Sequence, residues 1–211
     1  MELASLAQLE RHHRRHDDVM AGLVEAARRF AAGRPDADDL ERVRSAIQFF
    51  ERDVTRHFLD EEGSLFPRLS TRRPALAAQL SALADAHHAQ VQLQADVSAA
   101  ARGLGSSSRP GAGKYLLEAV GTLADAHAAH VATEDALLTA AASAFTAEDD
   151  REILAEMETR RDRDTRPITL PKKKQPTSSS TKPKKKPSKP RPSPSRSPAA
   201  KRAAPRRKSA R

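Results

Sequence analysis

Residues 40–61 of this 211-residue chain, LERVRSAIQFFERDVTRHFLDE, decide its fold. Their buried-type side chains recur at alternating steps of three and four, and a histidine and a glutamate continue the stripe: Leu40, Val43, Ile47, Phe50, Val54, His57 and Glu61. This spacing predicts an amphipathic helix from about 39 to the high 60s. A carboxylate on a core stripe is costly unless it is paired or bound to a metal.

Three further segments have the same periodicity and predict the remaining long helices. They span 3–31, about 71 to 101, and about 114–145. The stretch 103–113, GLGSSSRPGAG, predicts a flexible loop before the last of them. Four amphipathic helices of similar length with short links predict an all-α fold, an up-down-up-down four-helix bundle.

The charge distribution predicts three regions. Residues 166–211 contain 17 of the 37 Lys and Arg residues and none of the 28 Asp and Glu, which leaves 1–165 with a net charge of −8. We expect a bundle over 1–146 and a short charged helix over 147–164 that packs weakly or serves as a tether. Residues 165–211 are low in complexity, interrupted by proline and like-charged, so we predict a disordered basic tail.

The composition excludes several classes of site. The chain has no cysteine, so disulfides, thiolate metal sites and cysteine nucleophiles are ruled out. Neither a signal-type apolar run at the N-terminus nor a stretch of membrane-spanning length occurs, so we expect no membrane association and a cytoplasmic location.

All eight histidines fall in four clusters, one on each predicted long helix. Two clusters are followed four residues later by a glutamate, as His57 by Glu61 and His130 by Glu134. A spacing of four places both side chains on one helix face, so that they can reach a common metal. Imidazole and carboxylate are ligands of iron, zinc and manganese. The predicted metal ligands are His16, His57, Glu61, His87, His88, His130 and Glu134.

Some of these histidines could be ordinary helix residues that bind no metal. His12 and His13 lie in the run RHHRRH, where each is expected less often as a ligand than as an ordinary helix residue, although His12 could supply an extra ligand or support one. His127 lies on the core stripe, as either an extra ligand or a partner of a ligand. His87 and His88 are about 100° apart on a helix, and the helical phase favours His87.

The motif at 57–67, HFLDEEGSLFP, resembles the H-x-x-x-E-E-x-x-L-F-P signature of the hemerythrin-like (HHE cation-binding) family. Residues 130–138, HVATEDALL, are similar to a weaker second copy without the closing proline. His16, followed by Val19 and Leu23, is similar to the family's first ligand. In the third helix the family spacing matches His88, against the phase argument, so both histidines stay open.

The resemblance implies a non-haem di-iron site with Glu61 and Glu134 as bridges and with terminal histidine ligands. Oxygen carriers of the family commonly have another histidine one turn away on the third helix, and this chain lacks it. Either His127 or His12 could take its place, or one iron would keep an open or water-filled position, where O2, NO or peroxide would bind. The alternative is a ferritin-like site, which has a Glu-x-x-His motif on two helices. Glu10 and His13 match this motif, whereas Asp85 and His88 match it only if an aspartate stands in for the glutamate.

The basic tail predicts non-specific association with nucleic acid through phosphate contacts. It has no aromatic side chain to stack on bases. The contacts are expected to come from its clustered basic residues Lys172, Lys173, Lys174, Lys184, Lys185, Lys186, Arg206 and Arg207.

These features together favour an iron-binding protein that senses or stores iron, O2 or NO and is held near nucleic acid. A binding role is favoured over catalysis, because nothing in the sequence supplies a dedicated substrate pocket. The alternatives are a di-iron enzyme of peroxidase or ferroxidase type and a nucleoid-associated architectural protein.

Overall fold

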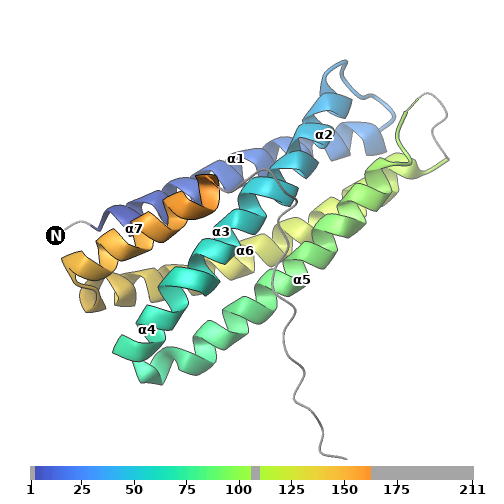
Figure 1. Ribbon diagram of the computed structural model, residues 1–211. Coiled ribbons are helices and arrows are strands. Elements are labelled where there is room, and N and C mark those ends of the chain that lie inside the picture. The colour runs from blue at the N-terminus through green and yellow to red at the C-terminus, as the bar shows by residue number, and fades with distance from the viewer. Residues whose placement is uncertain (1–2, 106–109, 163–211) are drawn as a thin grey trace, which may run out of the picture. The chain divides into compact units, whose positions relative to one another are not determined.

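The computed structural model describes residues 3–105 and 110–162. These residues form helices and no strands (Figure 1): α1 (Ala4–Ala31), α2 (Asp39–Phe49), η1 (Phe50–Val54), α3 (Thr55–Asp60), η2 (Glu61–Leu65), α4 (Phe66–Arg72), η3 (Pro74–Leu76), α5 (Ala77–Ala101), α6 (Ala112–Ala144) and α7 (Ala147–Asp162). The predicted all-α bundle is confirmed. Helix α6 packs along both α1 and α5, and α2 packs against α1. Figure 1 shows that successive rods run in opposite directions.

The second rod of the bundle consists of five segments, α2, η1, α3, η2 and α4, that follow one another without a break. The segments η1 and η2 are π-helical turns. The rod continues to Arg72, past Pro67, which we had expected near its end. Pro67 is tolerated because it lies in the first turn of α4, just after the π turn η2 has interrupted the i→i−4 hydrogen-bonding pattern.

The buried apolar residues form two clusters, and on α1, α5 and α6 the buried histidines lie between them. On α1, Leu9 belongs to one cluster and Met20 to the other, with His13 and His16 between them. On α6, Leu137 and Leu123 bracket His130 in the same way. The apolar clusters stabilise the bundle on both sides of a polar layer, which fixes that layer at mid-length.

The last helix, α7, packs more firmly than its polar sequence suggested. Ile153 and Met157 are fully buried and belong to the same apolar cluster as Leu9 and Leu65. In Figure 1, α7 lies beside α1. Two apolar side chains four residues apart form a narrow buried stripe, so the expectation of weak packing was wrong.

The predicted tail 165–211, with its clustered lysines and arginines, lies outside the described residues. Within the described residues, every helix falls short of the length or apolar content that a membrane span requires.

Candidate metal centre

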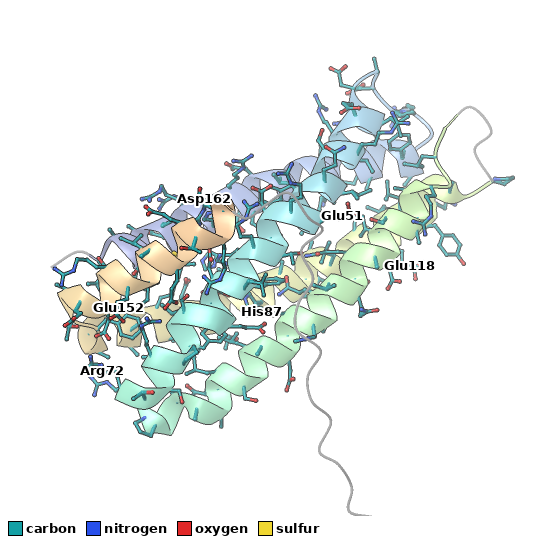
Figure 2. The ribbon with its side chains drawn as sticks, in the orientation of Figure 1. Glu51, Arg72, His87, Glu118, Glu152 and Asp162 are labelled. Carbon is teal, nitrogen blue, oxygen red and sulfur yellow. The ribbon has the colours of Figure 1, made fainter. Side chains whose placement is uncertain are left out.

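Six buried side chains from the four rods meet in two groups that share Glu61. The first group is His13, His57, Glu61 and Glu134, and the second is Glu61, His87 and His130. Within each group the potential ligand atoms lie within 4.8 Å of one another. Each of the six residues is at most 5% exposed. Figure 2 shows the side chain of His87 inside the bundle near its mid-length.

Glu61 faces both groups at once. Its Oε1 atom lies 2.8 Å from Nε2 of His57, and its Oε2 atom lies 3.1 Å from Nε2 of His87. Glu134 is placed similarly, since its Oε2 atom lies 3.2 Å from Nε2 of both His13 and His130. Each carboxylate therefore contacts an imidazole of each group, as a bridge between two cations would.

The donor atoms fit a metal. Among the described residues, both carboxylate oxygens of Glu61 and of Glu134, and Nε2 of His87 and of His130, make no well-aligned hydrogen bond, although several of these atoms lie close together. Two ligands about 2.1 Å from one ion and at right angles to each other lie about 3 Å apart, close to the separations here. The nitrogen and oxygen donors suit iron, manganese or zinc.

A further carboxylate orients one of these imidazoles. Oε1 of Glu62 lies 2.7 Å from Nδ1 of His87, so the opposite ring nitrogen points toward Glu61. Phe58 stacks on the His87 ring, with the centroids 4.0 Å apart and the planes at 11°. Glu62 is part of the motif at 57–67, but its contact with His87 was not predicted. Its position directly after Glu61 was the feature of the sequence from which a role beside the metal ligands could have been predicted.

His13, and not His16, enters the metal groups from α1. The available signal was the stripe Leu9, His13, His16 and Met20, all buried, which a 4-3-4 spacing places on one face. His16 follows His13 by three residues and so lies about 4.5 Å further along the helix axis. Its ring packs against that of His127, with the centroids 3.7 Å apart and the planes tilted by 35°, and Nε2 of His127 lies 2.8 Å from Oδ1 of Asp17.

The structure brings His87 into a group and leaves His88 outside. The Nδ1 atom of His88 lies 2.8 Å from the carbonyl oxygen of Ala84 in the preceding turn of its own helix. His12 is half-buried and stacks on His57 at 5.7 Å between centroids, outside both groups. His88 and His12 each lie one residue, or about 100° around the helix axis, from a residue of the centre, so their side chains point away from the inner face.

The electrostatics of the centre balance buried carboxylates against imidazoles. Burial lowers the pKa of His13, but the carboxylates of Glu134 and Glu61 outweigh it and raise the pKa to about 10. The pKa of His87 rises to about 9 because Glu61 and Glu62 likewise outweigh burial. Burial raises the pKa of Glu61, but the surrounding histidines bring it well below its ordinary value. Protons thus occupy, without metal, the places that a cation would take.

The rings beside the centre behave in the opposite way. Burial, and then the neighbouring His127, lowers the pKa of His16 well below its ordinary value. Burial also lowers the pKa of His127, against the charge of Asp17. These two rings are therefore neutral near pH 7, and they form an uncharged layer next to the charged one.

The fold and the site define a metal-binding four-helix bundle with histidine and carboxylate ligands. The family model for the hemerythrin HHE cation binding domain matches residues 4–142, and the chain belongs to this family. Comparisons with curated proteins and with solved structures give no match. Helix α7 begins beyond the matched residues.

Proposed function

We propose that this protein binds two iron ions in a non-haem centre and that the centre senses or stores iron, O2 or NO. The position of Glu61 supports the proposal most directly. Its two oxygens face imidazoles from different helices, His57 of α3 and His87 of α5. A single carboxylate shared in this way is what two adjacent cations require.

The number of donors supports a small exogenous ligand. Each group has two imidazoles and contacts the same two carboxylates. Leu83 and Val91, one turn on either side of His87, are apolar, so α5 adds one imidazole. Iron with these few protein donors has positions left for a diatomic ligand, and iron supplies the redox chemistry that sensing would use.

Metal analysis and the absorption spectrum of protein purified without air test the proposal. We expect two irons per chain and, after exposure to air, the absorption of an oxo-bridged di-ferric centre. A matched protein with His57→Ala should lose both signals. Protein that takes up no iron in either oxidation state would overturn the proposal. Sustained peroxide turnover by the iron-loaded chain would assign the centre to an enzyme.

We also propose that the tail associates with nucleic acid without sequence specificity. The support is its composition, with 17 basic and no acidic residues over 166–211. Each phosphate neutralised contributes about −0.9 to the slope of log affinity against log salt concentration. The test compares duplex DNA binding by the full chain with that by a variant in which eight basic residues become glutamine: Lys172, Lys173, Lys174, Lys184, Lys185, Lys186, Arg206 and Arg207.

The variant should bind DNA more weakly and with a shallower salt slope, while its metal content stays unchanged. Equal affinity and equal slope for the two proteins would contradict a role of these residues. Equal affinity of the wild-type chain for duplexes of different sequence is expected, and marked sequence preference would contradict phosphate-backbone binding.

A further inference from the structure

The end of α7 is attached to the turn that contains Glu61. Nη1 of Arg160 donates to Oδ1 of Asp60 at 2.8 Å, and Nη2 of Arg160 donates to Oγ of Ser64 at 2.6 Å. Nη2 of the next residue, Arg161, donates to Oδ2 of Asp60 at 3.1 Å. Both oxygens of the Asp60 carboxylate are thus bonded from α7.

The residues that Arg160 contacts lie on both sides of Glu61 along the chain. Asp60 is the last residue of α3, and Ser64 lies within the π turn η2, which begins at Glu61. Asp60 is 1% exposed and Ser64 is fully buried. The Ser64 hydroxyl also donates to Glu156 of α7. The guanidinium of Arg160 therefore spans the first turn of η2.

Gly63 allows this close approach. A Cβ atom at position 63 would lie 2.7 Å from Nη2 of Arg160, so the guanidinium packs directly on the backbone of the turn. A buried carboxylate such as Asp60 needs partners, and α7 supplies two. The arrangement is more specific than apolar docking of a helix would require.

A π turn is less stable than an α turn and is found mainly where surrounding contacts and function retain it. Here the turn starts at the carboxylate that the two metal groups share, Glu61. A small change of this turn would rotate that carboxylate away from one group or the other. The contacts of Arg160 restrict such a change.

We propose that Arg160 is a positioning residue for Glu61. It holds the π turn through Asp60 and Ser64, so that the two oxygens of Glu61 face the two metal groups. Helix α7, which lies outside the residues matched by the family model, thereby completes the metal centre. The inference rests on the proposed binding of two metal ions.

The alternative is that α7 only covers apolar surface with Ile153 and Met157. In that case loss of Arg160 would lower the stability of the protein and leave the properties of the metal centre unchanged. Metal affinity and the spectrum of bound metal distinguish the two roles. The stability of the protein does not, because loss of Arg160 would lower it in either case.

Titration of the full, chelator-treated chain with Co(II) provides the test, since the visible bands of Co(II) report its coordination. Arg160→Met keeps an unbranched apolar stem and removes the guanidinium with both hydrogen bonds. We expect it to weaken Co(II) binding in both groups by about 10- to 100-fold, the range seen for residues that orient metal ligands, and to change the visible bands. Arg160→Lys, which keeps a cation beside Asp60, should restore part of the affinity.

The matched control is Arg72→Met, which removes a contact at the other end of α7. Nη2 of Arg72 lies 2.8 Å from Oδ2 of Asp149 in the first turn of α7, and Figure 2 shows Arg72 and Asp162 near opposite ends of that helix. This variant should bind Co(II) as the wild type does, even if its unfolding temperature falls.

Ser64→Ala gives a milder second variant should Arg160→Met fail to fold. It removes one of the two contacts of Arg160 and should weaken Co(II) binding in the same direction by less. The role of Arg160 would be overturned if Arg160→Met bound Co(II) with wild-type affinity and wild-type visible bands. If Arg160→Met does not fold, the same result in both Ser64→Ala and Arg160→Lys would overturn it. Failure of the wild-type chain itself to bind two Co(II) ions would instead overturn the proposed function.

Discussion

The Nε2 atoms of His13 and His57 lie 2.9 Å apart, with their ring planes at 88°. Helices α1 and α3 thus direct two imidazole nitrogens at one point, although the residues are 44 positions apart in the chain. One hydrogen bond can join the two nitrogens there. When both nitrogens are deprotonated, this separation suits a common cation.

Replacement of His13 should affect metal binding far more than replacement of His16. His13→Ala removes an imidazole of the first group and should weaken its metal affinity by at least about 100-fold, more than the loss of an orienting residue. His16→Ala, a matched control on the same helix face, should keep the metal content of the wild type. Metal analysis after gel filtration measures both. Equal metal loss in the two variants would contradict the placement of the centre at His13.

Glu61→Ala should remove both metal ions, because Glu61 belongs to both groups. Glu51→Ala changes an exposed carboxylate on the same rod and should leave the metal content unchanged. The measurement is the metal-to-protein ratio together with the absorption spectrum. Retention of one full equivalent by Glu61→Ala would mean that the two groups do not depend on a shared bridge.

The metal-free protein should be most stable near pH 6.5. His13 and His87 have raised pKa values, about 10 and about 9, so their contribution is present below 6.5 and is lost as the pH rises through 9 to 10. His16 and His127 have lowered pKa values. Below pH 6.5 they take up protons in the unfolded chain before the folded one, so acid also reduces the free energy of unfolding.

Urea unfolding of chelator-treated protein at pH 5, 6.5 and 9.5 measures this pH dependence. Metal-loaded protein should lose less stability on the alkaline side, because the metal replaces the protons on the ligand nitrogens. A free energy of unfolding that increases steadily from pH 6.5 to 9.5 in the metal-free protein would contradict the raised pKa values.

Ile153→Ala should lower the free energy of unfolding by about 2–5 kcal/mol, the range for truncating a fully buried aliphatic side chain. Tyr115→Ala removes a larger side chain that is 74% exposed and should change it by no more than about 0.5 kcal/mol. Urea unfolding measures both variants. A negligible effect of Ile153→Ala would show that α7 is detached in solution.

The periodicity of the sequence was sufficient to predict the class of fold. Apolar spacing along each segment depends only on the pitch of the α-helix, so the four rods and their inner faces could be predicted locally. The same reasoning placed His57, Glu61, His130 and Glu134 on those inner faces, and the structure groups all four. It failed for α7, where only two of the sixteen residues are both apolar and buried, which is too weak a stripe to predict packing.

Which inward-facing histidine meets the others depends on how far each rod is shifted along its axis, and that shift is a property of the packed bundle. His13 and His16 face the same interior, but a difference of about 4.5 Å along α1 separates a residue within the centre from a residue beside it. The attachment of Arg160 to Asp60 joins residues 100 positions apart and has no local signature. The sequence therefore determined which side chains point inward, while side-chain packing between helices decided which of them meet in one group.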